Sequence, residues 1–351
     1  MTDHEVLTAV ISHLDPSSGC LHPVMRNGHV LLGLPGDSEA SGRTLGLYQP
    51  QRFAARAMVS ILRGLSAAGL HRVFLSKTRI TGGPAALNPA IPGIEPGSCG
   101  ILLGSPEHTT RRAIACYRNA GDWEVAKISF GEAGLRILEK ESEALRQLQP
   151  HAPGVPGLLG LHRAEGVTVL RMPYVSGHPI APGAPTDALE LLTCWIGKHA
   201  PKPVTEFPEW PDIESALSGS DAGSHRLKQL AGECLRPVVC HGDFARWNLL
   251  RKPDGKLVVL DWEWGHQGGL PGVDLVHYIL QDARLVKRMT PGDAILATRD
   301  ALDSPACRSY LKTTGWSNDP LLTILACLAY KQGAGHQDNL KMLAAGLQLK
   351  P

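Results

Sequence analysis

The stretch that decides the fold is VCHGDFARWNLLRKPDGKLVVLDWEWG, residues 239–265. It places His241, Asp243 and Asn248 within eight residues, and Asp261 follows eighteen residues after Asp243, at the end of an apolar run. One segment therefore offers an imidazole, a carboxylate that can take a proton, and carboxylate and amide oxygens for a hard cation. Phosphoryl transfer from a nucleotide requires these groups.

The residues between Asn248 and Asp261 predict a β-hairpin. Pro253-Asp254-Gly255 supplies turn residues between two apolar runs. A hairpin brings the ends of its two arms together, so Asn248 and Asp261 are expected to converge on one cation. Mg²⁺ prefers oxygen ligands and keeps several waters, which suits one carboxylate and one amide. Asp243 then faces the hydroxyl of an acceptor.

Two other interpretations fit parts of this segment. A His-Gly-Asp sequence is often a turn whose side chains cap backbone groups, and His and Asp also bind paired metals in metallohydrolases. The full spacing H-x-D-x-x-x-x-N, followed by a strand and a further Asp, favours the kinase-type interpretation.

Three motifs carry a resemblance to a known family. HGDFARWN at 241–248, VLDWEWG at 259–265 and PGVDLVHY at 271–278 resemble the catalytic loop, the metal turn and the following P-x-x-D-L of the aminoglycoside phosphotransferase and choline kinase-like family. That family is the small-molecule branch of the protein kinase-like fold. The resemblance implies Asp243 as the base, Asn248 and Asp261 as magnesium ligands, and His241 as the organiser of the loop. It also implies that Asp274 ties the loop to the next helix.

Two further positions in these motifs have implied roles. Glu263 lies two residues after Asp261, where choline kinase-like proteins also carry Glu, and the resemblance implies a role beside the metal. Arg246 departs from the family, which often has Pro or a small polar residue there. It either contacts a phosphate, as a catalytic residue, or only covers the loop.

The nucleotide-binding groups are expected upstream. DWEVAKISFG at 122–131 alternates as a strand does, and GLRILEKESEALRQL at 134–148 has helical spacing. The resemblance implies that Lys127 contacts the α- and β-phosphates and that Glu141 is its partner, with Glu143 and Glu139 as alternatives. Taken alone, each of these residues is more often an ordinary surface charge.

The phosphate loop is expected between two strands, in CGILLGSPEHTTRRAIACYR at 99–118. Gly104, Ser105, Thr109 and nearby amides are the candidate phosphate contacts. The loop lacks a G-x-G-x-x-G motif, which the aminoglycoside branch commonly lacks too, and an ordinary hairpin would have the same pattern.

The hinge that meets adenine is expected in GVTVLRMPYVSGHPI, residues 166–180. Relatives have M-E-Y-V-x-G there, and Pro173 replaces the Glu. Proline lacks an N–H but keeps its carbonyl. Met172 is therefore expected to end the strand, the Pro173 carbonyl to accept a hydrogen bond from adenine, and the Val175 amide to donate one.

Composition sets the outer limits. The chain has 351 residues, 43% of them hydrophobic and 19% charged, with a net charge of +2, as in a soluble globular protein. No basic face for nucleic acid, no membrane span and no signal pattern is evident. The eight cysteines show no metal spacing and are interpreted as reduced, mostly buried thiols. A cytoplasmic location is therefore expected.

Three segments are predicted along the chain. Residues 1–95 form an N-terminal α/β extension with a Gly/Pro-rich linker, 96–176 the nucleotide-binding lobe, and 177–351 the helical lobe with the catalytic loop, metal site and acceptor pocket. Within the extension we expect a hairpin at 24–35, a helix at 49–69 and a short strand at 73–75. LGLYQPQ at 45–51 resembles, more weakly, phosphotransferase-like proteins of bacterial surface-sugar assembly.

In the C-terminal segment, we expect a helix at 187–199, a solvated acidic loop at 200–225 and helices over 290–350. The same acids at 200–225 would also suit a cationic acceptor. The region 181–235 is expected to determine the acceptor.

The expected fold is α+β and protein kinase-like. The expected function is Mg²⁺- and ATP-dependent phosphorylation, with GTP as a possible donor, of a hydroxyl on a sugar, amino alcohol or aminoglycoside-like molecule. A nucleotide-binding pseudokinase or scaffold and a protein kinase are the alternatives. The sequence identifies neither the acceptor nor the oligomeric state.

Overall fold

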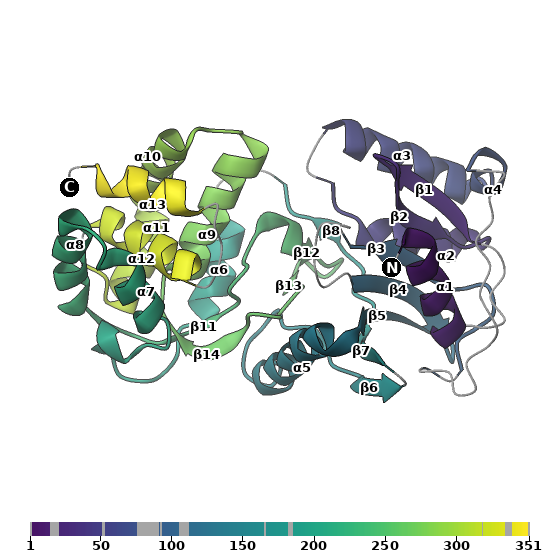
Figure 1. The fold of residues 1–351 in the computed structure, drawn as a ribbon, viewed down its shortest axis with the longest axis horizontal. Coiled ribbons are helices and arrows are strands. Elements are labelled where there is room, and N and C mark those ends of the chain that lie inside the picture. The colour runs from purple at the N-terminus through teal and green to yellow at the C-terminus, as the bar shows by residue number, and fades with distance from the viewer. Residues whose placement is uncertain are drawn as a thin grey trace. The chain divides into compact units, whose positions relative to one another are not determined.

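The computed structural model describes residues 2–14, 21–50, 53–75, 91, 93–104, 112–164, 166–181, 185–317, 319–333 and 339–349. The chain divides into two compact units (Figure 1). The first comprises Met1–Glu143 and Pro156–Val175, and the second Ala144–Val155 and Ser176–Pro351.

The first unit is built on a seven-stranded sheet in the order β1-β2-β3-β4-β5-β7-β6. Its strands are β1 (His22–Arg26), β2 (His29–Leu34), β3 (Gly100–Leu103), β4 (Arg112–Asn119), β5 (Asp122–Phe130), β6 (Gly160–Ala164) and β7 (Val167–Pro173). Every neighbouring pair is antiparallel. The predicted strands around Lys127, at 101–103 and at 167–172 are therefore confirmed.

The first hairpin belongs to this same sheet. Asn27 and Gly28 both have positive φ, 50° and 81°, as a two-residue hairpin turn requires, so the hairpin predicted at 24–35 is confirmed. Because β2 pairs with β3, the hairpin extends the sheet, and the described part of residues 1–95 lies in the first compact unit.

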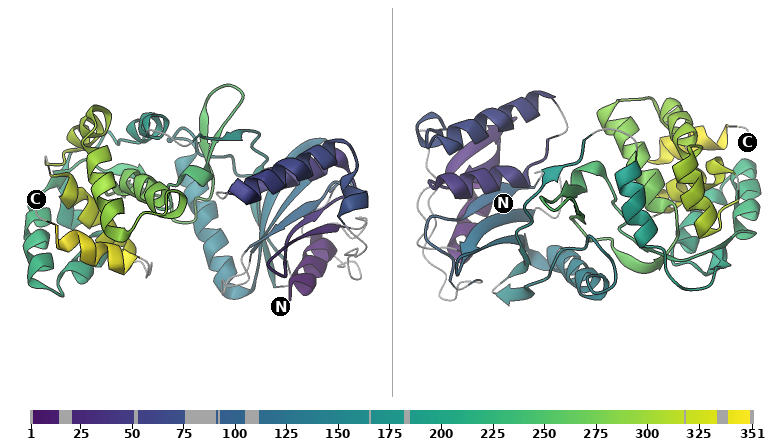
Figure 2. Two further views of the ribbon diagram at one scale, coloured as in Figure 1. Left: turned by 90° about the horizontal axis from the view of Figure 1, so that it is seen from above. Right: turned by 180° about the vertical axis from the view of Figure 1, so that it is seen from behind.

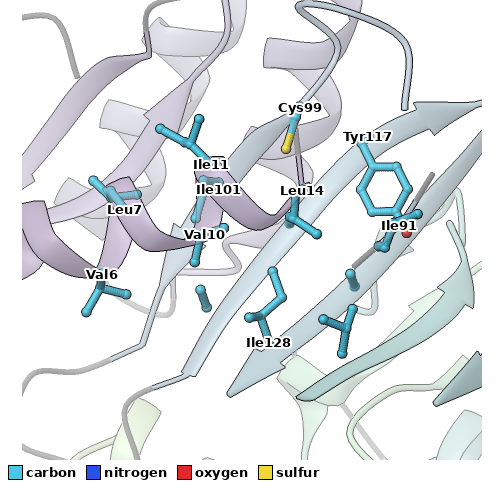
Figure 3. Packing of buried hydrophobic residues seen from close by; sticks show 14 of the residues in the cluster. Val6, Leu7, Val10, Ile11, Leu14, Ile91, Cys99, Ile101, Tyr117 and Ile128 are labelled. Carbon is cyan, nitrogen blue, oxygen red and sulfur yellow. The ribbon is translucent and has the colours of Figure 1, made fainter. Parts of the chain in front are cut away.

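Helices cover both faces of this sheet: α1 (Asp3–Leu14), α2 (Ser38–Leu47), α3 (Phe53–Ala67), α4 (His71–Phe74) and the start of α5 (Gly131–Leu148). Figure 3 shows the apolar side of α1, with Leu7 and Val10, packed against Ile101 and Ile128. Leu102 points the opposite way and packs with Leu45 and Leu62 of α2 and α3, since side chains alternate along a strand. Figure 2 shows α1 and α3 on opposite faces of the sheet.

The structure changes part of the N-terminal prediction. The helix predicted at 49–69 is present as α3, but the strand predicted at 73–75 is wrong, because His71–Phe74 forms α4. The β-branched Val73 and the aromatic Phe74, followed by Leu75, suggested a strand, and their local propensity is overridden here. Helices α1 and α2 had no prediction. Most of the predicted Gly/Pro-rich linker lies outside the described residues.

Charged and aromatic side chains of helix α2 contact the β4–β5 hairpin. Glu39 accepts hydrogen bonds from Arg43, Arg118 and the indole of Trp123. The Arg43 guanidinium lies 4.7 Å from the Trp123 ring centroid and 5.0 Å from that of Tyr174, within the range of cation–π attraction. Residues of the predicted extension therefore contact the predicted hinge.

The second unit is mainly helical, with small strand pairs. Its helices are α6 (Thr186–Cys194), η1 (Val204–Glu206), α7 (Trp210–Leu217), α8 (Asp221–Ala231), η2 (Arg246–Asn248), α9 (Val273–Gln281), η3 (Asp282–Val286), α10 (Pro291–Leu302), α11 (Pro305–Thr314), α12 (Pro320–Gly333) and α13 (Asn339–Leu347). Its strands are β8 (His178–Pro179), β9 (Lys202–Pro203), β10 (Cys234–Leu235), β11 (Val238–Cys240), β12 (Leu249–Arg251), β13 (Leu257–Val259) and β14 (His266–Gly269). The α+β prediction and the helices predicted over 290–350 are confirmed.

Two predictions in this unit need correction. The solvated loop predicted at 200–225 is wrong, because the segment contains α7 and α8 and its acid Glu209 is only 1% exposed. The helix predicted at 187–199 ends at Cys194, and Ile196 forms an antiparallel bridge with Val238, the first residue of β11.

No disulfide joins any two of the described cysteines. Cys116, Cys240, Cys307 and Cys327 are buried, whereas Cys194 and Cys234 are exposed. Among the described helices, none has the length and apolar character needed to cross a membrane.

Candidate active site

Lys127 and Glu141 form a buried ion pair in the first unit. The Lys127 ammonium donates to both Glu141 carboxylate oxygens, at 2.6 and 2.7 Å, and the two side chains are 9% and 1% exposed. Neighbours Ala126 and Ile128 belong to the core that α1 covers, so Lys127 points to the other face of the sheet. Glu139 instead pairs with Arg163. A buried pair is costly to break, which holds the lysine in one place.

The candidate phosphate contacts are only partly described. Gly104 directly follows β3, and its amide donates to the Arg112 carbonyl at 2.8 Å. An added Cβ at Gly104 would lie 2.9 Å from that carbonyl oxygen. Ser105 and Thr109 lie outside the described residues.

The predicted hinge follows the end of β7. Met172 and Pro173 are the last residues of that strand, opposite Val125 and Glu124. The next amide, of Tyr174, donates to the Trp123 carbonyl at 2.9 Å and so serves the sheet. The Pro173 carbonyl and the Val175 amide stay as the predicted adenine contacts.

A buried network near the hinge was not predicted from the sequence. Glu124 accepts from the Tyr117 hydroxyl at 2.8 Å and from Arg171 at 2.8 to 3.0 Å. These residues alternate with apolar ones on β4, β5 and β7, and nothing in a single sequence pairs them.

The 241–248 loop of the second unit is held by Asp274 on α9. One Asp274 oxygen accepts the amide of His241 at 2.6 Å and the other accepts the amide of Gly242 at 3.0 Å. Gly242 has φ of 82°, and an added Cβ would lie 2.5 Å from that of Trp264, so this turn requires glycine. The contacts agree with the tie that the sequence implied for Asp274.

We expect Asp274→Ala to destabilise the second unit by about 2–6 kcal/mol, because two buried amides lose their acceptor and each costs about 1–3 kcal/mol. Chemical denaturation of the full chain measures this. Asp300→Ala, on the exposed side of α10, is the matched control. Equal midpoints for the two variants would contradict the assigned tie.

His241 organises the loop from inside. Burial lowers the pKa of His241, so the ring is neutral. Its Nε2 donates to the Leu260 carbonyl at 2.9 Å, and its Nδ1 accepts the Asp243 amide at 3.2 Å. Its ring centroid lies 4.7 Å from that of Trp262 and 6.1 Å from that of Phe244. The imidazole therefore links the loop to the end of β13 and is itself enclosed by aromatic rings.

Asp243 receives hydrogen bonds from both sides. His277 Nε2 lies 2.8 Å from one carboxylate oxygen, and Asn248 Nδ2 lies 3.2 Å from the other. Burial opposes ionisation of Asp243, but the bond from His277 and the charge of Lys331 outweigh it and lower its pKa to about 2. Burial and Lys331 also lower the pKa of His277. Near neutral pH, an ionised Asp243 thus accepts from a neutral His277.

His277 is a residue that sequence reasoning missed. It lies one helical turn after Asp274, within the PGVDLVHY motif, and only the fold brings it to Asp243. Its spacing from Asp274 placed both on one face of the helix, which was the available signal.

We expect His277→Leu to lower kcat by roughly tenfold to a hundredfold, because His277 holds the predicted base Asp243 and a misplacement of a catalytic group by about 1 Å costs on the order of 10²-fold. His277→Gln keeps a nitrogen donor near the same place and should recover most of the rate. Steady-state kinetics would show kcat changing while KM for the nucleotide stays near wild type. Equal losses in the two variants would mean that His277 only fills space.

Asn248 and Asp261 are brought together by the predicted hairpin. β12 and β13 pair antiparallel, and the Leu260 amide donates to the Asn248 carbonyl at 2.7 Å. Asn248 Nδ2 also donates to the Asp243 carbonyl at 2.9 Å, so these bonds engage the nitrogen of the Asn248 amide, and its oxygen stays the predicted cation ligand. Asp261 follows with φ of 71°, a conformation rare outside glycine. Glu263 lies in the same turn and is partly buried.

Arg246 lies in the 241–248 loop and forms an ion pair with Asp282, the first residue of η3, which directly follows α9. Its Nε lies 3.2 Å from an Asp282 oxygen, and the side chains are 10% and 13% exposed. This contact supports covering of the loop, one of the two roles considered for Arg246. A contact with phosphate stays a prediction.

Residues 117–297 match the model of the phosphotransferase enzyme family, APH. No curated protein matches the chain.

Solved structures to which the chain is similar include aminoglycoside phosphotransferase APH(3'')-Id from Streptomyces rimosus in complex with ADP and streptomycin (17% identity, 65% of this chain and 90% of that chain, TM-score 0.41). Choline kinase LicA from Streptococcus pneumoniae gives 13% identity over 73% of this chain and 94% of that chain, with a TM-score of 0.41. A putative fructosamine-3-kinase from Haemophilus somnus gives 13% identity over 70% and 89%, with a TM-score of 0.45.

The matched segment runs from β4 through α10 and contains Lys127, Glu141, Asp243, Asn248 and Asp261. Because it covers more than half of the chain, this protein belongs to the APH phosphotransferase enzyme family.

Proposed function

We propose that this chain transfers the terminal phosphoryl group of ATP to a hydroxyl of a small molecule, with Mg²⁺. The observation that carries the proposal is the arrangement around Asp243. An ionised carboxylate is held by His277 and Asn248, and the backbone of Asn248 is bonded to the residue before Asp261. These contacts support Asp243 as the base and the neighbouring Asn248 and Asp261 as oxygen ligands for a hard cation.

The donor set fits magnesium. Asn248 has its nitrogen engaged with Asp243 and presents an oxygen, and Asp261 adds a carboxylate, with Glu263 as a neighbour in the same turn. These are hard ligands, and Mg²⁺ commonly takes one or two carboxylates plus phosphate oxygens and water. When bound, the ion neutralises charge on the phosphates during transfer.

The roles of the protein groups follow from their partners. Lys127, oriented by Glu141, contacts the α- and β-phosphates, and Pro173 and Val175 contact adenine through the backbone. Asp243 accepts the proton of the acceptor hydroxyl, and His277 keeps that carboxylate ionised and oriented. Positioning of the two reactants and charge stabilisation then supply most of the rate.

A screen with labelled nucleotide tests the proposal. The full chain is incubated with Mg²⁺ and γ-labelled ATP or GTP against sugars, amino alcohols and aminoglycosides, and label transfer is followed. We expect transfer to a member of one class, dependent on Mg²⁺ and absent with Asp243→Asn. Transfer that persists with Asp243→Asn would contradict the roles assigned here. Nucleotide binding without transfer to any acceptor would favour a pseudokinase.

A further inference from the structure

Glu209, Cys240 and His266 converge in the second unit, apart from the residues assigned to the phosphotransfer site. One ligand atom from each lies within 4.8 Å of the other two. Cys240 and His266 are direct partners across the β11–β14 pair. Glu209 precedes α7 but makes no capping bond to that helix. Its carboxylate instead turns toward the strands, where Oε1 accepts the Leu270 amide at 3.0 Å.

Gly269 leaves space among these three side chains. An added Cβ there would lie 2.5 Å from Cys240 Sγ, 2.6 Å from His266 Nε2 and 2.9 Å from Glu209 Oε1. Any larger residue would therefore occupy the point on which the three atoms converge. Glycine in this strand keeps the three side chains accessible to a common small ligand.

The hydrogen bonds around His266 require a positive charge. Its Nδ1 lies 3.1 Å from the Trp264 carbonyl and its Nε2 lies 2.8 Å from Glu209 Oε1. Both partners are acceptors, and a neutral imidazole carries a single proton. The second nitrogen therefore faces the carboxylate either with an additional proton or across a bound cation.

The second Glu209 carboxylate oxygen, Oε2, gives a further indication that a ligand binds here. Glu209 is 1% exposed, and among the described residues its Oε2 has no hydrogen-bond partner. A buried carboxylate oxygen without a partner is costly, and a metal ion would satisfy it.

We infer that Glu209, Cys240 and His266 form a binding site for Zn²⁺. Thiolate and imidazole favour a borderline-soft ion over Mg²⁺. The thiolate and the carboxylate together cancel the charge of a divalent ion, so the buried site is neutral. Three protein ligands leave a fourth position for water, and the His266 side chain, 30% exposed, gives access from solvent. His266 Nδ1–H on the Trp264 carbonyl orients Nε2 toward the ion.

The ion would connect the start of α7 to the last residue of β11. Cys240 is followed directly by His241, the first residue of the 241–248 loop. Zinc at this site would thus hold the residue that directly precedes the loop, and it would add stability without joining the transfer step.

The test measures metal in the untagged full chain, with excess Mg²⁺ present so that hard-cation sites are filled. We expect about one zinc per chain by elemental analysis. Removal by a chelator, with Mg²⁺ restored, should lower the melting temperature, and added Zn²⁺ should restore it. With Co²⁺ in place of Zn²⁺, a thiolate-to-cobalt charge-transfer band should appear.

Three variants assign the ligands. Cys240→Ser, His266→Gln and Glu209→Gln are expected to weaken zinc binding by roughly 100-fold or more, since loss of even an outer-shell partner costs about 10- to 100-fold. Cys240→Ser should also lose the cobalt band. Cys307→Ser, which removes another buried thiol, is the matched control and should keep both.

Two results would overturn the site. One is wild-type protein that takes up no zinc and has the same melting temperature with and without it, which needs no variant to fold. The other is equal zinc binding by Cys240→Ser and Cys307→Ser. Either result would mean that His266 carries an additional proton instead of binding a metal ion, and that its contact with Glu209 is an ion pair.

Discussion

Replacing Asp243 with Asn is expected to lower turnover by roughly 10²–10⁴-fold, the range for loss of a general base. The substitution keeps the shape of the side chain but removes the charge that accepts the hydroxyl proton. It also puts an amide where His277 Nε2 lies at 2.8 Å and Asn248 Nδ2 at 3.2 Å. Nucleotide affinity, measured by calorimetry with ADP and Mg²⁺, should stay near wild type, because the nucleotide contacts are assigned to other residues.

The matched control is Asp300→Asn on α10, which removes the same charge from an exposed position and should leave turnover unchanged. The variant Asp243→Asn must also keep the wild-type melting temperature within a few degrees for the comparison to report on chemistry. Normal turnover in a folded Asp243→Asn chain would show that another group takes the proton.

Local patterns predicted the parts of this fold that lie close together in the sequence. Pro253-Asp254-Gly255 between apolar runs predicted the hairpin that joins Asn248 to Asp261, and pairing of β12 with β13 confirms that hairpin. Asn27-Gly28 predicted the first hairpin in the same way. The family resemblance, rather than a local pattern, implied Glu141 ahead of Glu139 as the partner of Lys127, and Lys127 and Glu141 are in contact.

Contacts between distant segments were beyond a single sequence. His277 reaches Asp243 across 34 positions and Glu209 reaches His266 across 57, and no pattern within a window links them. The acidic stretch 200–225 was interpreted as a loop because Pro, Ser and Gly are frequent there. In the structure, Pro211 lies in the first turn of α7 and Ser220 caps α8, positions where these residues favour helix starts.

The N-terminal residues show the same limit. The amphipathic pattern of α3 was evident, but nothing local indicates that β1 and β2 extend the sheet that carries Lys127. Gly100 gives the physical reason for the close fit of α2. An added Cβ at Gly100 would overlap the Thr44 side chain, so the helix approaches β3 only where the strand lacks a side chain.

Replacing Asp261 separates function from backbone strain. Asp261 has φ of 71°, which costs a residue other than glycine about 1–3 kcal/mol. We expect Asp261→Asn, Asp261→Gly and Asp261→Ala each to lower Mg²⁺-dependent turnover by roughly 100-fold or more, because each removes a proposed metal ligand and even an outer-shell loss costs about 10- to 100-fold. Kinetics over a range of Mg²⁺ concentrations measures this loss.

The Gly and Ala variants should share the loss of activity but differ in stability. Gly and Ala both lack the carboxylate and its contacts, but only Gly adopts a positive φ without strain, so Asp261→Gly should be about 1 kcal/mol more stable than Asp261→Ala. Denaturant titration compares them directly. If Asp261→Gly is inactive but at least as stable as Asp261→Ala, the carboxylate of Asp261 is needed for activity and its strained backbone conformation is not needed for stability. Activity retained in Asp261→Gly would remove Asp261 from the metal site and leave Asn248 and Glu263 to hold the ion.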